Sequence, residues 1–516
     1  MNRFVLAGCG LAMGLALTGA LLGGGALAQQ AANGADANRL VPPPRRLAPP
    51  VPALLQHRTH EIFTSVCSAC HGNNLDGGSA RSLFTTAFLD ANSDAQIVDA
   101  ITNGPAGVSN HGFKTMFSPE EIAQLPAYLR IRGGILNRHI GPVPDISGKD
   151  FDSEKAKFKV ETLVKGLDQP WGMAFLPDGQ MIFTERAGRL RFLSKSGKLS
   201  EAVKNTPTVF VRQDGGMLDV ALPPDYAQTG WIYLSYSTVR PGYVVQPGDD
   251  KAPNLAPPTM TVVVRGKVNK KNEWVDQQVL FQAPGDMYTH PADHYGSRFL
   301  FDGKGHVYWS MGERHDYQSA QNLASPLGKI HRINLDGSIP ADNPFLHTPG
   351  ALPSIWTYGH RNPEGLAIDP VTGLFWETEH GPVGGDEVNI IEPGKDYGWG
   401  VATMGLEPGI WRQFAPGMTP PITFYNPSIG PSGITFYTGD KFPAWKNNLF
   451  ITGMVGQRLI RMEIDGRKIA HQEILFQGYG RVRDVRTGPD GYLYALLQNQ
   501  NGDPTGGSIV RLVPSK

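Results

Sequence analysis

Two cysteines close together are the first residues in this sequence whose types and spacing predict chemistry. They stand in Cys67-Ser68-Ala69-Cys70-His71. A histidine directly after such a pair is typical of c-type haem attachment, with two thioethers to the haem and the imidazole as an axial iron ligand. A redox dithiol would need a thioredoxin-like setting, and a zinc site would need a second ligand pair. The sequence therefore predicts haem attachment at Cys67 and Cys70 and iron ligation by His71.

A helix is predicted downstream of this motif. Ser118-Pro119-Glu120-Glu121 combines an N-cap, a proline at the first helical position and a capping-box glutamate. Three apolar residues then fall on one face, namely Ile122, Leu125 and Leu129. Gly133 and Gly134 are expected to end the helix.

The order of these features resembles class I cytochromes c, from about His57 to Gly134. In that family a methionine loop precedes the last helix and completes the iron coordination. The resemblance implies Met116 as the sixth ligand, and His111 is the rival. Pro126 departs from a regular helix and implies a kink. We predict a small all-α cytochrome c domain over 57–138.

The N-terminus predicts export. Residues 1–28 carry an Arg near the start, an apolar stretch from Leu11 to Leu22 and a small-residue end at Ala26-Leu27-Ala28, as in a cleaved signal peptide. A membrane anchor is the alternative, but the apolar run is short for a span. The expected location is periplasmic or secreted. Linkers are expected at 29–56, which is proline-rich, and at 139–156.

Composition excludes several classes of protein. The 516 residues are 40% hydrophobic, enough for a sizeable core in two or three units. Lys+Arg and Asp+Glu are equal at 47 each, so nothing favours nucleic acid or an anionic membrane as a partner. The 62 Gly and 42 Pro indicate many tight turns, and hence many short strands.

A turn followed by a short apolar-aromatic strand recurs along the rest of the chain. The units are 177–183, 229–234, 303–309, 372–376, 447–451 and 490–494. Their spacing suits four-stranded blades with insertions, whereas a pair of β-sandwiches gives no reason for similar repeats. We predict an all-β six-bladed β-propeller over 157–516.

Several motifs in this region resemble the soluble quinoprotein glucose/sorbosone (aldose sugar) dehydrogenases. The resemblance runs from about Val160 to the C-terminus. The motifs are Gly166-Leu167-Asp168-Gln169-Pro170-Trp171-Gly172-Met173, Gly359-His360-Arg361-Asn362-Pro363-Glu364-Gly365-Leu366, Glu379-His380-Gly381-Pro382 with Gly385-Asp386-Glu387-Val388-Asn389, and Pro431-Ser432-Gly433-Ile434.

The resemblance implies that pyrroloquinoline quinone (PQQ), a planar tricarboxylate quinone, binds near the propeller axis. The matching cofactor residues are Arg361, Asn362, Arg481 and Arg483. Guanidinium groups bind carboxylates in a bidentate way, and the alternation Arg481-Val482-Arg483 places both arginines on one face of a strand.

His294 aligns with the family's general base, which takes a proton from the sugar C1 hydroxyl as hydride passes to the quinone. A histidine suits this step because its usual pKa is near neutrality. Asp293 is expected to orient the imidazole or to favour its charged form. Arg361 would also stabilise negative charge on the reduced quinone.

Calcium is the third implied cofactor, beside PQQ and haem c. By resemblance, the carbonyls of Gly381 and Pro382 hold the ion at the quinone, while Glu387 and the Tyr397 carbonyl match a second calcium site. The alternative for Glu387 is a plain charged loop.

Three departures concern the substrate more than the chemistry. Asp214 stands where glucose-oxidising members have glutamine, a cofactor-contacting lysine is missing near Met454-Val455-Gly456-Gln457, and His380 replaces another glutamine. The last two resemble the aldose sugar branch.

Together the domains predict a PQQ- and calcium-dependent sugar dehydrogenase that oxidises aldoses at C1 or sorbosone-like aldehydes. Electrons would pass to its own haem and then to an external cytochrome or oxidase. The alternatives are a non-catalytic propeller that binds a sugar or a protein, and a quinoprotein dehydrogenase for alcohols or polyols.

Overall fold

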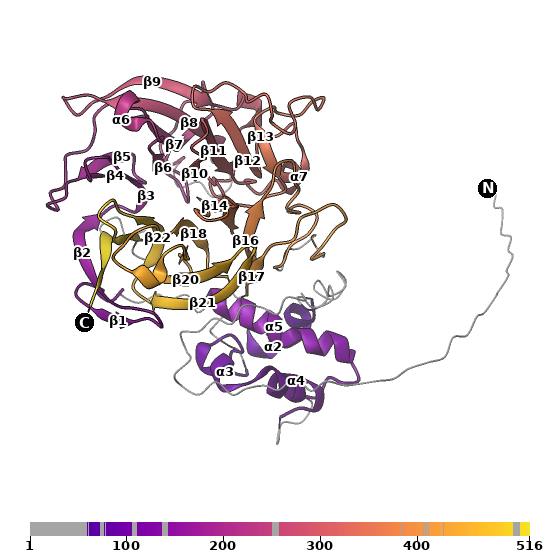
Figure 1. Ribbon diagram of the computed structural model, residues 1–516. Helices are drawn as coiled ribbons and strands as arrows, with labels where there is room; N and C mark the ends of the chain where they lie inside the picture. Colours follow the sequence, from indigo (N-terminus) through magenta and orange to yellow (C-terminus); the bar gives the residue numbers. More distant parts are fainter. Residues whose placement is uncertain are drawn as a thin grey trace, which may run out of the picture. The chain divides into compact units, whose positions relative to one another are not determined.

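A computed structural model gives the fold (Figure 1). It describes residues 59, 61–72, 77, 79–105, 111–136, 143–249, 257–382, 384–405, 407, 410, 412–426, 428–498 and 506–515. The predicted signal peptide and the proline-rich linker lie outside these residues. Within them, no helix has the length and apolarity needed to cross a membrane.

The N-terminal described residues form helices. They are the π-helical turn Phe63–Cys67, α2 (Ser68–His71), α3 (Thr86–Ala91), α4 (Asp94–Asn103) and α5 (Pro119–Leu136). The predicted capping box is confirmed, because Glu121 N donates to Ser118 Oγ at 3.2 Å and Ser118 N donates to Glu121 Oε2 at 2.8 Å. The predicted apolar face is also buried, but α5 continues through Pro126 and past Gly134 to Leu136.

The rest of the chain forms six antiparallel sheets. The first three in chain order are β3 (Pro170–Phe175), β4 (Met181–Glu185) and β5 (Arg189–Leu193); β6 (Met217–Ala221), β7 (Ile232–Val239), β8 (Thr259–Val268) and β9 (Trp274–Phe281); and β10 (Phe299–Phe301), β11 (His306–Met311), β12 (Lys329–Asn334) and β13 (Ile355–Tyr358). Two further sheets are β14 (Pro363–Ile368), β15 (Phe375–Glu379), β16 (Asp386–Ile391) and β17 (Thr423–Tyr425); and β18 (Pro431–Phe436), β19 (Leu449–Gly453), β20 (Arg458–Asp465) and β21 (Lys468–Gln477). Short helical segments interrupt the connections, namely α6 (Tyr226–Thr229), Gly285–Met287, α7 (Tyr317–Gln321) and Pro443–Trp445.

The sixth sheet closes the ring. Its strand order is β1 (Asp150–Asp152), β2 (Lys157–Leu167), β24 (Gly507–Pro514), β23 (Leu493–Gln498) and β22 (Arg481–Thr487). The N-terminal strand β2 therefore pairs with the C-terminal strand β24, which ties the two ends of the propeller together. The predicted linker 139–156 includes β1, so part of it belongs to this blade.

The six predicted repeats correspond to one position in each blade. They become β4, β7, β11, β15, β19 and β23, each the second strand from the axis. Their side chains fill the space between blades: Trp309 of β11 and Trp376 of β15 are fully buried. The prediction of a six-bladed propeller is confirmed.

The innermost strands are β3, β6, β10, β14, β18 and β22, and each contacts its neighbour around the ring. Three of them begin with Pro-x-Gly. Glycine is required there because a Cβ on Gly172 would collide with the Asp219 carboxylate, and one on Gly433 would collide with that of Asp484. These glycines allow neighbouring inner strands to approach closely.

Candidate functional site

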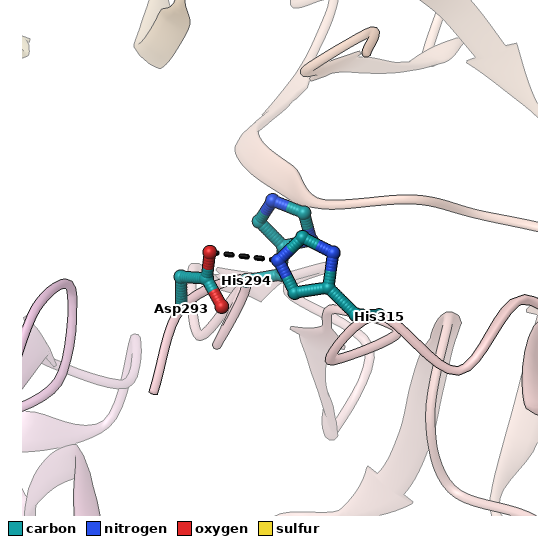
Figure 2. A group of neighbouring side chains, drawn as sticks. All are labelled: Asp293, His294 and His315. Atoms are coloured by element: carbon teal, nitrogen blue, oxygen red, sulfur yellow. Dashed lines mark hydrogen bonds and ion pairs between the residues drawn. The ribbon is translucent and has the colours of Figure 1, made fainter. Parts of the chain in front are cut away.

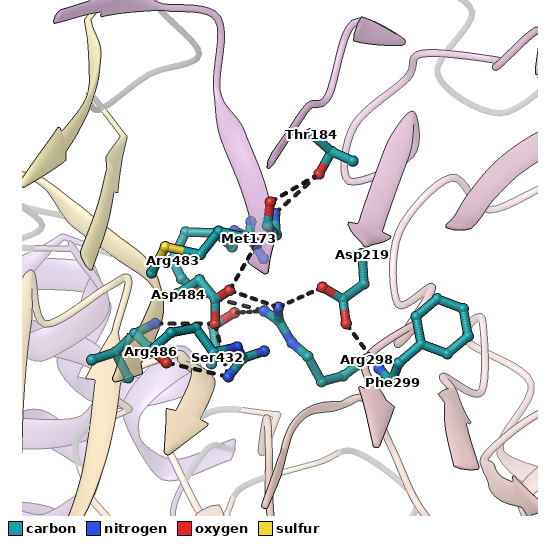
Figure 3. Close-up of polar contacts among 12 residues, drawn as sticks. Met173, Thr184, Asp219, Arg298, Phe299, Ser432, Arg483, Asp484 and Arg486 are labelled. Atoms are coloured by element: carbon teal, nitrogen blue, oxygen red, sulfur yellow. Dashed lines mark hydrogen bonds and ion pairs between the residues drawn. The ribbon is translucent and has the colours of Figure 1, made fainter. Parts of the chain in front are cut away.

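Residues near the starts of all six inner strands meet around one buried guanidinium (Figure 3). Arg298, next to β10, is fully buried, and its Nη1 lies 3.0 Å from Asp219 Oδ1 and 3.4 Å from Asp484 Oδ2. Its Nε donates to the Glu364 carbonyl oxygen at 2.9 Å. Trp171 of β3 covers it, with the guanidinium carbon 4.3 Å from a ring centre. This network fixes the ends of the inner strands, and hence the loops that precede them.

His294 lies in the loop before β10 and contacts a carboxylate that the sequence did not indicate. Its Nδ1 is 2.5 Å from Glu313 Oε1, and the residue is only 7% exposed. Burial, and then the nearby charge of Arg361, hold the pKa of His294 well below its usual value, so the imidazole is neutral at neutral pH. Burial also raises the pKa of Glu313 to about 7. A neutral imidazole held at Nδ1 is the form that accepts a proton at Nε2.

A second histidine lies beside the first (Figure 2). The ring centres of His294 and His315 are 4.3 Å apart, and His315 Nε2 is 2.7 Å from Asp293 Oδ2. This hydrogen bond raises the pKa of His315. Asp293 therefore contacts His315, not the His294 imidazole as expected, and Glu313 takes the orienting position. The signal that sequence reasoning missed is the polar run 313–316 directly after β11.

The backbone around these histidines is strained. His294 has a φ of 55° and His315 one of 59°, in the left-handed region that non-glycine residues rarely adopt. Arg314, between Glu313 and His315, has a φ of 57°. Such strain gathers at functional sites, where the surrounding structure holds it.

Two of the predicted cofactor residues meet at one carboxylate. Arg483 Nη1 lies 2.6 Å from Glu364 Oε2, and Asn362 Nδ2 donates to Glu364 Oε1 at 3.1 Å. Arg361 lies close enough to His294 to lower its pKa, and its guanidinium carbon is 5.1 Å from a Trp399 ring centre. The structure does not show Arg481 at Glu364; its Nη2 lies 3.6 Å from Met454 Sδ.

Arginine side chains near His294 and Glu364 are incompletely paired. Among the described residues, the buried Nε atoms of Arg361 and Arg483 have no hydrogen-bond partner. Arg186, which follows β4, was not predicted from the sequence. Burial and the charge of Arg483 lower its pKa, whereas the charge of Asp214 acts in the opposite direction. Buried guanidinium groups without full partners suit an anionic ligand.

The predicted residues of the first calcium site lie in the loop after β15. Gly381 N donates to Asp386 Oδ1 at 2.9 Å, which fixes this turn. Across the part of the chain that the structure describes, neither the Gly381 nor the Pro382 carbonyl accepts a hydrogen bond. Unpaired carbonyl oxygens are suitable ligands for calcium.

Glu387 belongs to a buried group of carboxylates, not to a plain charged loop. Asn389 Nδ2 lies 3.0 Å from Glu377 Oε2, 3.3 Å from Glu379 Oε1 and 3.2 Å from Glu387 Oε2. Burial and the charge of Glu379 raise the pKa values of Glu377 and Glu387 well above the usual range. We call Glu377, Glu379 and Glu387 the carboxylate cluster.

Tyr397, the other residue predicted for the second calcium site, borders this cluster through one histidine. Its ring stacks on that of His360, with ring centres 4.7 Å apart, and His360 Nδ1 lies 3.1 Å from Glu379 Oε1.

The helical part has a cavity of about 120 Å³ that is lined by the residues predicted to hold haem, and we call it the haem cavity for that prediction. Its lining includes Cys67, Cys70, His71, His111, Phe113 and Phe117. His71 Nδ1 lies 2.7 Å from the Arg81 carbonyl oxygen. Met116, the predicted sixth ligand, does not line this cavity, and the residue is 61% exposed.

Comparison with protein-family models gives two matches. Residues 167–511 match "Glucose / Sorbosone dehydrogenase", and residues 55–129 match "Cytochrome C oxidase, cbb3-type, subunit III". The chain belongs to the glucose/sorbosone dehydrogenase family. Its N-terminal helical region resembles a cytochrome c.

Other family members resemble the propeller closely. Aldose sugar dehydrogenase YliI of Escherichia coli is 39% identical over 357 residues, 67% of this chain and 92% of that protein. The apo-form structure of the soluble aldose sugar dehydrogenase from Escherichia coli has a TM-score of 0.62 at 36% identity, over 69% of this chain and all of that one. The PQQ-bound aldose sugar dehydrogenase from Streptomyces coelicolor has a TM-score of 0.55 at 26% identity, over 70% of this chain and 99% of that one.

In this member of the glucose/sorbosone dehydrogenase family, His380 is part of the site. Its Nε2 lies 2.7 Å from the Pro431 carbonyl oxygen, and its Nδ1 lies 3.3 Å from Asn362 Nδ2. Asp214, just before β6, lies near the same groups: burial, and then the charges of Glu364 and Asp293, raise its pKa. Both departures from the glucose-oxidising pattern therefore lie near this site.

Proposed function

We propose that this protein is a PQQ- and calcium-dependent aldose sugar dehydrogenase that passes electrons to its own c-type haem. The observation that carries the proposal is the buried His294–Glu313 pair beside Arg361, whose Nε has no partner among the residues that the structure describes. A base and an anion-binding group thus meet at one end of the propeller. The PQQ-bound relative from Streptomyces coelicolor supports the choice of cofactor.

The residues present fit a tricarboxylate. The unpartnered Nε atoms of Arg361 and Arg483, with Arg186 nearby, offer the charge, and Asn362 and Arg481 complete the proposed set. The carbonyls of Gly381 and Pro382, which accept no hydrogen bond within the described ranges, fit a calcium ion. The carboxylate cluster beside Tyr397 fits a second one, because buried carboxylates are stabilised by a cation.

When bound, PQQ supplies the two-electron acceptor and haem c the one-electron outlet. His294 removes the proton from the C1 hydroxyl of an aldose, or of a hydrated sorbosone-like aldehyde, as C1 loses hydride. Glu313 accepts the Nδ1 hydrogen of His294, so that Nε2 has its lone pair free. Arg361 would stabilise the negative charge on the reduced quinone. The product formed from an aldose is its lactone.

The proposed haem is attached to Cys67 and Cys70, with His71 as an iron ligand. The hydrogen bond from His71 Nδ1 to the Arg81 carbonyl leaves Nε2 for iron. A cytochrome on the same chain is present at a high local concentration, so it is a natural acceptor for electrons from the propeller. We further propose that the N-terminal signal exports the protein to the periplasm or beyond, where a cytochrome or an oxidase takes the electrons.

A substrate panel tests this function. The full chain is loaded with PQQ and Ca²⁺, and aldoses, aldehydes and simple alcohols are compared by the reduction of an artificial dye. Aldoses and aldehydes are expected to support turnover, and omission of PQQ should abolish it. Turnover with alcohols alone, or with no compound, would contradict the proposal.

A further inference from the structure

The haem cavity contains a second histidine that faces the first. The ring centres of His71 and His111 are 5.9 Å apart, and their ring planes meet at 82°. A metal–nitrogen bond of about 2 Å on each side of one ion would put two imidazole centres roughly 6 Å apart. The observed separation therefore suits two imidazoles that share one metal ion.

Both histidines are held in the same way. His71 Nδ1 lies 2.7 Å from the Arg81 carbonyl oxygen, and His111 Nδ1 lies 3.3 Å from the Ala100 carbonyl oxygen. A carbonyl accepts but cannot donate, so each Nδ1 carries the hydrogen and each Nε2 is left with a lone pair. Metal-binding histidines usually make such a bond through the nitrogen that does not bind the metal.

Met116 lacks these features. The residue is 61% exposed, and the turn that carries it is fixed by bonds from Met116 N and Phe117 N to the Phe113 carbonyl, both at 2.9 Å. The same turn directs Phe113 and Phe117 to the haem cavity, with their rings stacked at 5.9 Å. Met116 therefore lies at the surface, outside the lining of this cavity.

We propose that His111, and not Met116, is the second axial ligand, so that the haem iron is bound by two histidines. This inference rests on the proposed c-type haem and names a ligand for it. Methionine–histidine ligation raises the reduction potential of a haem. The bis-histidine iron is therefore expected to have a lower potential than the His–Met pair implied by the family resemblance.

Spectroscopy of the full-length oxidised protein distinguishes the ligands. Bis-histidine ligation predicts a low-spin iron without the long-wavelength band that sulfur-to-iron charge transfer produces. Near-perpendicular imidazole planes further predict a low-spin electron paramagnetic resonance signal with large g anisotropy. A sulfur charge-transfer band in the native protein would overturn the assignment.

Matched variants complete the test. Met116→Leu is expected to leave the spectrum and the midpoint potential unchanged, whereas His111→Met should introduce the sulfur band and raise the potential. His111→Ala should convert the iron to high spin. Loss of the native low-spin spectrum in Met116→Leu, with His111→Ala unchanged, would overturn the proposal.

Haem attachment is measured separately by haem staining after denaturing electrophoresis, which does not depend on the axial ligand. A chain without covalent haem would overturn both the cofactor and the ligand proposals. A chain with covalent haem but methionine ligation would overturn only the ligand.

Discussion

The Nδ1 atom of His294 lies 2.5 Å from the Oε1 atom of Glu313, and both side chains are buried at one end of the propeller. The other carboxylate oxygen of Glu313 has no partner among the described residues. The contact with His294 Nδ1 is therefore the main interaction of this carboxylate, and it fixes the position of the imidazole.

Substitution of this pair should lower turnover strongly. General acid–base groups typically contribute about 10²–10⁴-fold, so His294→Ala is expected to reduce kcat by that amount. Glu313→Ala should reduce it roughly 10-fold to 10²-fold, because the imidazole remains but is no longer held. Steady-state dye reduction by the loaded enzyme measures both. His347→Ala, a change of an exposed histidine, is the control; equal losses in all three variants would refute the assignment.

The pH dependence of kcat/KM should show an acid limb near neutrality. Burial raises the pKa of Glu313 to about 7, so the carboxylate gains a proton as the pH falls through that value. It can then no longer accept the Nδ1 hydrogen of His294, and activity should fall. Glu313→Gln cannot titrate and should flatten this limb. A limb of the same shape in Glu313→Gln would show that another group titrates.

Arg298 is expected to be critical for stability. Arg298→Met leaves Asp219 as a buried charge without its cationic partner and leaves Asp484 with Arg486 alone, and breaking a buried pair in this way typically costs about 3–5 kcal/mol. The exposed pair Arg467–Glu392 supplies the control, since Arg467→Met should cost at most about 1 kcal/mol. Urea unfolding followed by tryptophan fluorescence measures both values, and similar losses would contradict the role of the network.

Much of the architecture followed from the sequence, because turn chemistry and apolar alternation are local signals. The unit around Pro177-Asp178-Gly179 predicted β4, and five similar units predicted the second strands of the other blades. Cys67, Cys70 and His71 were likewise found by spacing, and all three line one cavity.

The remaining site residues depend on contacts between distant segments. The Glu313–His294 contact follows from the pairing of β10 with β11, and the meeting of Arg483 with Glu364 from another blade follows from closure of the propeller. Neither contact has a local signature in the sequence. Met116 was favoured by its position before α5, but the direction of its side chain depends on how Phe113 and Phe117 pack. Register within a loop cannot be read from spacing alone.

Calcium should stabilise the protein more as the pH rises. Glu377 and Glu387 have pKa values raised above 4.5 by burial and by Glu379, so the folded calcium-free protein holds protons that the unfolded chain releases. The free energy of unfolding of the calcium-free protein should therefore fall as the pH increases above about 4.5. Bound Ca²⁺ offsets the repulsion between the ionised carboxylates.

The gain in Tm with Ca²⁺ over chelator should be larger at about pH 8 than at about pH 5.5. Glu387→Gln should reduce this gain. A gain that does not change with pH would argue against the carboxylate cluster as a calcium site.

Rapid mixing of the PQQ- and Ca²⁺-loaded full chain with an aldose, followed at the haem absorbance, measures electron transfer from the sugar to the haem. We expect sugar to reduce the haem at a rate independent of protein concentration, and His294→Ala to slow this reduction about 10²-fold or more. Haem that stays oxidised after sugar is added, or that is reduced equally fast in His294→Ala, would contradict the proposed function.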